Sequence, residues 1–152
     1  MSTTPYFDAI QLIERLHRYF LDVVKVELDR KGIQDINNVQ AMILYNIGHD
    51  EMTVGELTLR GYYLGSNVSY NLKKMVESGY LVQERSTHDR RSVRVRLTEK
   101  GRKFHEIIAK LFEQHVKNLG RANLDEVGIA STNEVLKRLE RFWLNAQQYD
   151  LT

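Results

Sequence analysis

With 152 residues, 42% of them hydrophobic and 28% charged, the chain is long enough to bury one core and has the composition of an ordinary folded protein. The absence of cysteine excludes disulfides, thiol catalysis and cysteine-ligated zinc. No apolar run reaches the roughly 18 residues of a membrane-spanning helix, and the opening MSTTPYFDAI lacks the order of a signal peptide, so we expect a cytoplasmic protein.

The net charge of +2 conceals an uneven distribution of charge along the chain. Residues 66–103 hold ten Lys or Arg against four Asp or Glu, a net +6 that leaves the rest of the chain at −4. A basic block inside an acidic chain is typical of a surface that neutralises nucleic-acid phosphates. A solvated charged face has the same composition, so the order of the structural elements must distinguish the two.

The first part of the chain has helical periodicity. Apolar residues at helical spacing predict a long amphipathic helix over residues 6–28, which Pro5 starts. A shorter helix is expected over 38–47, where Gly48 is placed to end it, and another over 54–60.

The next expected helix, over 66–78, has two different faces. Ser66 is placed as its N-cap and Gly79 follows its last turn. One face is apolar, while the other is small and polar at the N-terminal end and cationic further on. The apolar positions are Val68, Leu72, Met75 and Val76.

After this helix the hydrophobic period changes to 2, which predicts two strands over 80–85 and 92–98. In the second strand, valine or leucine alternates with arginine. The connecting STHDRRS contains no hydrophobic residue, so we expect an exposed hairpin tip.

The remainder of the chain returns to helix. Thr98 is placed to cap a helix that continues to Leu119. The segment LGRANLDEVG interrupts it, and a last helix is expected from Ser131 or Thr132 to Tyr149.

This order of elements predicts a mainly α protein with a small β-ribbon, in which a winged helix-turn-helix is flanked by N- and C-terminal helices. We expect a single domain over 1–152, with 36–101 as the winged helix-turn-helix lobe and 5–31 and 102–150 as dimerisation helices. In such a lobe one helix enters the major groove, which is about 12 Å wide, and presents its N-terminal side chains to base edges.

Side chains on the polar helix face and in the hairpin tip are suited to contacting DNA. Serine, asparagine and tyrosine bond bases or phosphates, and lysines neutralise phosphates. Arginines of the tip can reach the minor groove, whose negative potential attracts them. Surface lysines and hairpin loops taken singly are common without such a role, but their combination in this order favours DNA binding. The expected contact residues are Ser66, Asn67, Ser69, Tyr70, Lys73, Lys74, Arg90 and Arg91.

The segments MTVGEL and VSYNLKKMVESGYLVQERSTHDRRSVRVRLTEKGR resemble the MarR family, the multiple antibiotic resistance regulators. The most specific part is DRRSVRVRLTEKG. It contains the family's Asp-x-Arg pair at Asp89 and Arg91, and it closes with the Leu-Thr-x-x-Gly motif at 97–101. The resemblance by motif covers 53–102, and the terminal helices resemble the family by pattern.

Several expectations follow from this resemblance. Family members are homodimers whose terminal helices intertwine and whose two winged helices bind a pseudo-palindromic operator, most often to repress transcription. Arg91 is then the wing arginine, and Asp89 holds its side chain. The run RGYYLGSNVSYNLKKM further resembles a subgroup associated with regulating L,D-transpeptidases in cell-wall remodelling. The helix contacts that the resemblance implies are those of Ser66, Asn67, Ser69, Tyr70 and Lys74.

The turn before the recognition helix departs from the family pattern. Where the family usually has a Leu-Gly-Leu-Ser kind of turn, this chain has Gly-Tyr-Tyr-Leu at 61–64. Gly61 and Gly65 can supply the positive φ that the bend requires. We expect Tyr63 to point inward and Tyr62 to offer its hydroxyl to a phosphate; packing of both rings against the turn is the alternative.

Both ends of the chain carry large aromatic residues, which are favoured at interfaces between subunits. Two-fold symmetry would place the recognition helices about one DNA turn, roughly 34 Å, apart. A monomer that folds its terminal helices onto itself is the alternative. The aromatic residues concerned are Phe7, Phe142, Trp143 and Tyr149.

Members of the family commonly respond to small, often aromatic ligands that bind between the dimer helices and the DNA-binding lobe. The helix order places several polar and apolar side chains near such a cleft, although a buried tyrosine or methionine also serves simply as core. The candidate effector-binding residues are His17, Phe20, Met42, Tyr45, Arg60 and Tyr63.

Other classes of function fit the sequence less well. The five histidines never fall at i, i+4, and the pair His105-Glu106 lacks a second histidine at helical spacing. No nucleophile elbow, phosphate loop or dinucleotide fingerprint occurs, so we expect no enzyme, no cofactor and no metal site. A winged helix used only for protein interaction would not need the basic wing, and RNA readers usually show stacking aromatics on an open sheet.

Overall fold

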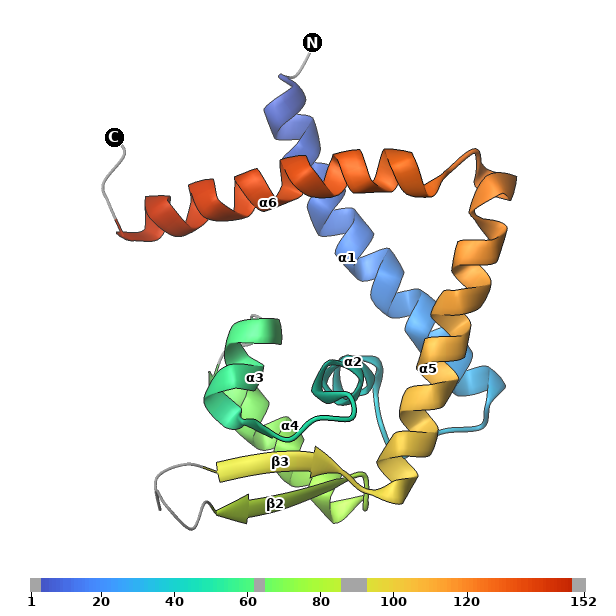
Figure 1. The fold of residues 1–152 in the computed structure, drawn as a ribbon, viewed down its shortest axis with the longest axis vertical. Coiled ribbons are helices and arrows are strands. Elements are labelled where there is room, and N and C mark those ends of the chain that lie inside the picture. The colour runs from blue at the N-terminus through green and yellow to red at the C-terminus, as the bar shows by residue number, and fades with distance from the viewer. Residues whose placement is uncertain (1–3, 62–64, 86–92, 149–152) are drawn as a thin grey trace. The chain divides into compact units, whose positions relative to one another are not determined.

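A computed structural model describes residues 4–61, 65–85 and 93–148, with the side chains of 59–61, 65, 66 and 148 left outside the description. The chain divides into two compact units, Met1–Leu111 and Phe112–Thr152. In the part of the chain that the structure describes, the first unit contains helices and a small sheet, and the second continues as helix (Figure 1). Within the described residues, no helix is both long enough and apolar enough to cross a membrane.

The first helix, α1, spans Pro5–Arg30 and confirms the long helix expected over 6–28. Thr4 caps it, because the Thr4 hydroxyl accepts a hydrogen bond from the Phe7 amide at 3.5 Å. Proline at the first helical position has no amide hydrogen to leave unpaired. After Arg30 the chain turns away through Gly32, which has a φ of +70°.

The second helix, α2, spans Asn38–Ile47, as the sequence predicts. Asn37 and Gln40 form a reciprocal capping box in which each side chain accepts the other residue's backbone amide, at 2.8 and 3.0 Å. Gly48 ends the helix with a φ of +63°. This helix lies at the centre of the first unit, where it contacts α1, α3, α4 and β3 (Figure 1).

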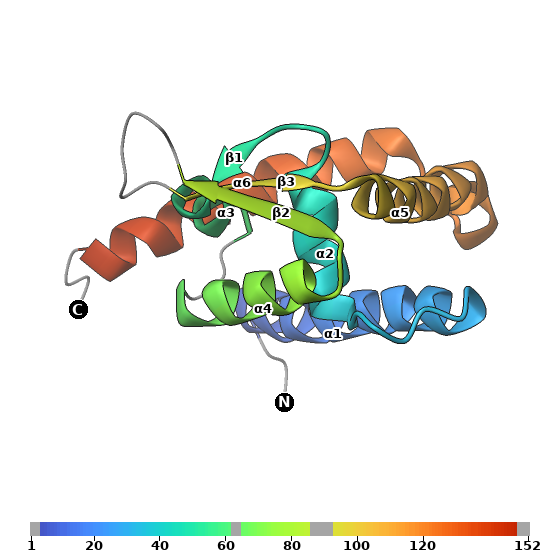
Figure 2. The same ribbon diagram turned by 90° about the horizontal axis from the view of Figure 1, so that it is seen from below.

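The sheet has one strand more than the predicted ribbon. Strands β2 (Leu81–Arg85) and β3 (Val93–Leu97) form the expected hairpin, and β1 (Met52–Thr53) pairs with the other edge of β3. The order β1-β3-β2 is antiparallel throughout, with β3 in the middle (Figure 2). A strand of two residues is too short to show a period of 2, and for that reason the sequence did not reveal β1.

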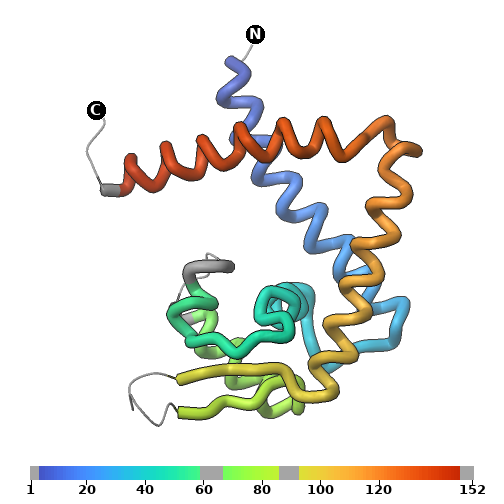
Figure 3. Tube along the Cα trace, in the orientation of Figure 1, coloured from blue at the N-terminus to red at the C-terminus, as the bar shows by residue number. Residues whose placement is uncertain are grey.

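Helices α3 (Val54–Gly61) and α4 (Gly65–Glu77) follow each other along the chain (Figure 3). Helix α4 begins at Gly65, so Ser66 lies inside its first turn and the predicted N-cap is wrong by position. Its other end is as expected. Gly79 adopts a φ of +84°, and the amide of Tyr80 donates to the carbonyl of Met75 at 2.9 Å.

Apolar side chains from all these elements form the core of the first unit. Tyr80 and Phe104 pack edge to face with ring centroids 5.7 Å apart. Gly101 lies so close to the sheet that a Cβ there would collide with the carbonyl of Tyr80. The largest fully buried side chains are those of Val24, Ile43, Leu44, Ile47, Leu57, Val68, Leu72, Met75, Val95 and Ile108.

Helix α5 (Glu99–Asn118) starts in the first unit and continues into the second. Thr98 caps it as predicted, because its hydroxyl accepts from the amide of Gly101 at 3.2 Å. A short 3-10 helix, η1 (Leu119–Ala122), and then α6 (Glu126–Gln148) complete the chain.

The predicted start of the last helix, at Ser131 or Thr132, is wrong, because α6 begins at Glu126. Asp125 caps it by accepting the amide of Gly128 at 2.6 Å. A Cβ at position 128 would lie 3.2 Å from that same carboxylate oxygen. The glycine therefore permits a tight cap and does not act as a helix breaker.

Candidate nucleic-acid interface

Helix α4 separates its two faces as the sequence predicts. Val68 and Leu72 are fully buried and Met75 nearly so, which fixes the helix against the core. The opposite face is exposed, and 61% of Tyr70 is accessible to solvent. Five of the predicted DNA-contact residues share this exposed face: Asn67, Ser69, Tyr70, Lys73 and Lys74.

The two lysines of this face differ in their surroundings. The Lys74 ammonium lies 5.8 Å from the centre of the Tyr70 ring and 3.8 Å from a carboxylate oxygen of Glu77. Because Lys74 and Glu77 are both about half exposed, their ion pair is weak. Among the described side chains, no carboxylate pairs with Lys73, so its charge is available to a phosphate.

The polar end of α4 is tied to the start of α2. Gln40, which is buried, donates from its side-chain amide to Oδ1 of Asn71 at 3.1 Å. Asn71 in turn donates from Nδ2 to the backbone carbonyl of Asn67 at 2.9 Å. The sequence carries no signal for this link, because Gln40 and Asn71 belong to different helices and their spacing along the chain does not relate them.

The strands of the wing carry less free positive charge than their sequence indicates. Arg94 and Arg96 are both exposed on β3, but the Arg96 guanidinium contacts a carboxylate oxygen of Glu84 at 3.0 Å. Strand register also places Glu84 directly opposite Arg94. Glu84 therefore offsets the charge of Arg96 and occupies the position across from Arg94. The predicted tip residues Asp89, Arg90 and Arg91 lie outside the described residues.

A groove of about 590 Å³ connects α4 with the wing. Ser69 and Lys73, both predicted to contact DNA, lie on its α4 side. Gln83 of β2, which is not among the predicted contact residues, lies on the wing side. The residues that line the groove are Thr53, Val54, Gly55, Ser69, Leu72, Lys73, Gln83 and Val93.

The start of α3 forms one rim of this groove. The hydroxyl of Thr53 accepts from the amide of Glu56 at 3.1 Å, and the Glu56 carboxylate accepts from the amide of Thr53 at 3.4 Å. These bonds make a capping box that holds the rim in place. The pattern Thr-x-x-Glu at 53–56 was the available sequence signal for it.

A polar cluster fixes the base of the wing. Asp35 accepts from the Tyr80 hydroxyl at 2.7 Å and from the Lys100 ammonium at 2.8 Å, and Lys100 also lies 4.3 Å above the Tyr80 ring. Burial acts to raise the pKa of Asp35, but these two hydrogen bonds, the charge of Lys100 and a backbone hydrogen bond together outweigh it, and the pKa is below its ordinary value. Burial, followed by the bond to Asp35, raises the pKa of Tyr80.

The other predicted site residues are more scattered. Tyr62 and Tyr63 lie outside the described residues, as do the side chains of Ser66 and Arg60. His17 is exposed on α1, beside a surface hollow lined by Ile13, Glu14, His17 and Arg18.

The remaining candidate effector residues lie on α1 and α2. Phe20 on α1 is 37% exposed, and Met42 on α2 is half-buried. Tyr45 on α2, also half-buried, stacks on His105, with ring centroids 4.9 Å apart. The effector site stays a prediction.

This winged-helix geometry agrees with what comparison with known proteins finds. Residues 36–101 match the family model described as a winged helix DNA-binding domain. The exopolysaccharide II synthesis transcriptional activator ExpG of Rhizobium meliloti (strain 1021) is 37% identical over 150 residues, which cover 99% of this chain and 77% of ExpG.

Two solved structures share the fold at lower identity. Streptococcus pneumoniae FabT, crystallised in complex with DNA, has a TM-score of 0.73 and 22% identity, with 93% of this chain and 99% of FabT covered. AbsC, a MarR family transcriptional regulator from Streptomyces coelicolor, has a TM-score of 0.76 and 18% identity, with 95% and 98% covered.

Proposed function

Because this chain belongs to the winged-helix DNA-binding transcriptional regulators of the MarR type, we propose that it acts as a homodimer that binds a pseudo-palindromic operator through α4 and the wing. The observation that carries the proposal is the exposed polar and cationic face of α4, which continues into a groove bordered by the wing. DNA-binding regulators of this kind act on the chromosome, so we also place the protein in the cytoplasm.

Helix α4 is proposed to enter the major groove with its N-terminal half. There Asn67, Ser69 and Tyr70 face base edges or the nearest phosphates, while Lys73 and Lys74 neutralise phosphates further along. Ser66 and the tip residues Arg90 and Arg91 complete the contact set, with Tyr62 as a phosphate contact and Asp89 holding Arg91. The buried opposite face of α4 supports this orientation, because it leaves one face free for DNA.

Exposed apolar side chains support the proposed dimer. Helix α1 and the second unit leave many large hydrophobic side chains in solvent, which is unfavourable unless a partner covers them. Phe7 is 56% exposed and Phe142 is 52% exposed, whereas Trp143 is half-buried and Tyr149 lies outside the described residues. The exposed apolar residues of these parts are Tyr6, Phe7, Leu12, Leu16, Tyr19, Phe20, Val23, Val26, Val116, Leu124, Val127, Val135, Leu136, Phe142 and Leu144.

Fluorescence anisotropy tests the proposal directly. The labelled probes are the duplex upstream of the protein's own gene and a scrambled duplex of equal length, each titrated at two salt concentrations. The expected result is tight binding that weakens with salt and favours the native duplex. Sedimentation of the complex should give two chains per duplex. Equal, weak binding to both duplexes would overturn sequence-specific recognition and favour a protein-interaction module instead.

The direction of regulation follows from a separate measurement. The relative ExpG is named as an activator, whereas the family resemblance favours repression. We propose repression as the commoner mode, to be tested with a reporter gene behind the native upstream duplex. Higher reporter output without the regulator would support repression, and lower output would establish activation.

The class of regulated genes is also a proposal, and we propose genes for L,D-transpeptidases. The run at 60–75 resembles regulators of L,D-transpeptidases, while ExpG is named for exopolysaccharide II synthesis. Duplexes upstream of an L,D-transpeptidase gene and of a polysaccharide-synthesis gene from the same genome give a direct competition. Preference for the first duplex would support the cell-wall assignment.

A small aromatic effector is proposed to act through α1 and α2. Support comes from the contact between these helices and from the partial exposure of Phe20, Met42 and Tyr45. A panel of phenolic carboxylates, including salicylate, can be added to the preformed complex. Release of the duplex by one compound, weakened by Met42→Ala, would support this site; release unaffected by that substitution would place the effector elsewhere.

A further inference from the structure

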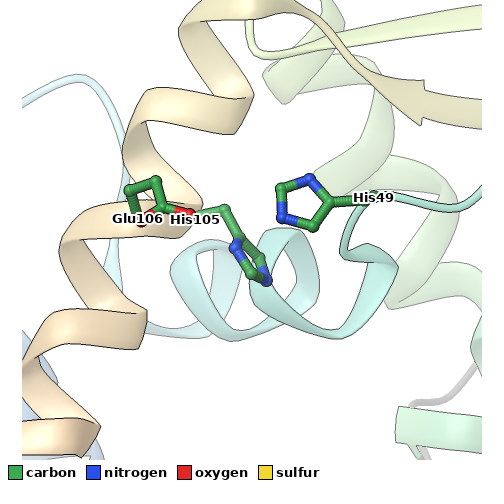
Figure 4. A group of neighbouring side chains, drawn as sticks. All are labelled: His49, His105 and Glu106. Atoms are coloured by element: carbon green, nitrogen blue, oxygen red, sulfur yellow. The ribbon is translucent and has the colours of Figure 1, made fainter.

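Two histidines and a glutamate meet beside α2, away from the surface proposed to bind DNA. Figure 4 shows His105 and Glu106 on α5, with His49 facing them from the turn after α2. One potential ligand atom from each residue lies within 4.8 Å of the other two. The two imidazole rings are 4.7 Å apart between centroids and inclined at 58°. The fold thus supplies the second histidine that the pair His105-Glu106 lacks in sequence.

The environment of His105 leaves one of its polar atoms without a partner. Its ring is half-buried and stacks on Tyr45 at an interplanar angle of 10°. Its Nδ1 is buried, and no hydrogen-bond partner for it exists among the described residues. Leaving a buried polar atom unpaired costs stability, so such an atom calls for a partner that the protein alone does not provide.

The surroundings of His105 favour the neutral form of its imidazole. Burial, and then the proximity of His49, lower the pKa of His105 from its ordinary value, although Glu106 opposes the shift. A neutral imidazole has a lone pair to donate, and neutral imidazole is the commonest protein ligand for transition metals.

We propose that His49, His105 and Glu106 form a binding site for a divalent transition-metal ion, with Zn²⁺ as the ion that fits best. Two imidazoles and one carboxylate are a ligand set typical of zinc, whereas Mg²⁺ and Ca²⁺ favour all-oxygen sites. The absence of cysteine excludes the thiolate sites that select softer ions.

The geometry requires a modest adjustment on binding. Zinc bonds of roughly 2.0–2.2 Å in a tetrahedral arrangement place ligand atoms about 3.4 Å apart, and the three side chains here begin within 4.8 Å. His49 and Glu106 are exposed and can rotate to close this difference, while stacking holds His105 in place. Three protein ligands leave the fourth position for water or a small ligand.

An ion at this site would link the turn after α2 to α5, two parts of the first unit that are far apart in sequence. Binding would therefore stabilise the folded unit, because the unfolded chain has no preformed site. The three residues take no part in the DNA contacts proposed above. Failure of this inference would consequently leave the proposed function untouched.

Isothermal titration of tag-free, chelator-treated protein with ZnCl₂ tests the site, and the absorption spectrum with Co²⁺ reports the coordination geometry. The expected result is one ion per chain, a tetrahedral-type Co²⁺ spectrum and a rise in melting temperature with Zn²⁺. The variants His49→Ala and Glu106→Gln should each weaken binding by at least about tenfold.

A matched control keeps the result specific. His115→Ala removes an exposed histidine outside the cluster and should leave Zn²⁺ affinity unchanged. Circular dichroism confirms that each variant is folded. Zn²⁺ affinity that is the same in the parent and in the double variant of His49 and Glu106 would overturn the proposal. So would the absence of binding to the parent, which would reduce the cluster to aromatic packing around Tyr45.

Discussion

Gln40 donates a hydrogen bond from Nε2 to Oδ1 of Asn71 at 3.1 Å, although the two residues belong to α2 and α4. The same Gln40 side chain accepts the backbone amide of Asn37 at 3.0 Å and so closes the capping box of α2. Asn71 passes the connection on to the carbonyl of Asn67, on the face of α4 proposed to meet DNA. One buried amide thus fixes both the start of α2 and the orientation of the recognition helix.

Replacing Gln40 with alanine should therefore reduce both stability and DNA affinity. We expect the free energy of unfolding to fall by about 1–3 kcal/mol, because the two hydrogen bonds that the Gln40 side chain makes, with the Asn37 amide and with Asn71, contribute about 0.5–1.5 kcal/mol each. Urea denaturation measures this change. Gln34→Ala, at an exposed position, serves as the control and should stay within about 0.5 kcal/mol of the parent. Equal stability of the two variants would contradict the role given to Gln40.

Gly101→Ala should destabilise the lobe by about 1–3 kcal/mol or more, because the new methyl group would overlap the carbonyl of Tyr80 and force the start of α5 away from the sheet. Gly120→Ala is the matched control, since a Cβ at Gly120 meets nothing within 4 Å. Thermal or chemical denaturation of the two variants compares them directly. A Gly101→Ala protein as stable as the control would contradict this prediction, because the backbone would then accommodate the methyl group without loss of unfolding free energy.

The pH dependence of stability should reveal the Asp35 cluster. Because the pKa of Asp35 is lowered in the folded protein, its contribution is present above the unfolded pKa of about 3.9 and is lost as pH falls through the folded pKa. Asp35→Asn should cost about 1 kcal/mol or less at pH 7, because Asp35 and Lys100 are both about half exposed. The difference from the parent should shrink below about pH 4. A difference that persists unchanged at pH 3 would exclude an electrostatic origin.

Lys73→Ala should weaken binding to the native and scrambled duplexes by a similar factor. It should also reduce the slope of log affinity against log salt concentration by about 1, the value for one phosphate contact. This follows if Lys73 neutralises a phosphate beside the groove. Anisotropy titrations at several salt concentrations provide the slope. Lys110→Ala, on the exposed side of α5, is the control and should change neither quantity. An unchanged slope for Lys73→Ala would remove Lys73 from the interface.

Phe142→Ala should shift the protein toward monomer without loss of helix content. More than half of this side chain is exposed within one chain, so its removal opens no cavity in the core. In the proposed dimer it is buried, and truncation of a buried interface aromatic commonly costs about 2 kcal/mol or more. Sedimentation velocity over a range of concentrations measures the shift. A profile identical to that of the parent would place Phe142 outside the interface.

Local signals made much of the fold predictable from the sequence. The bounds of α2 and the C-terminal ends of α1 and α4 follow from apolar periodicity and from glycines that the structure places at positive φ. The polar face of α4 follows from the same helical period, because its opposite face is buried as expected. These features are decided by neighbours along the chain, so a sequence pattern is sufficient to find them.

The features that the sequence did not reveal depend on distant residues or on unusual local chemistry. Strand β1 exists because β3 offers it an edge, with Met52 paired to Val95. The early start of α6 depends on the Asp125 cap, which Gly128 permits. The meeting of His49 with His105 and the bond from Gln40 to Asn71 are products of the tertiary fold alone.

The contact between Gly101 and Tyr80 changes what the Leu-Thr-x-x-Gly motif can be taken to mean. Thr98 caps α5 through the Gly101 amide, and the glycine itself is required because no side chain fits beneath the Tyr80 carbonyl. Thr98 and Gly101 are therefore required by the junction between β3 and α5, whatever the surface of the lobe binds. A search by this motif alone would therefore find winged helices of any function. The DNA-binding members among them must be recognised by the exposed face of α4.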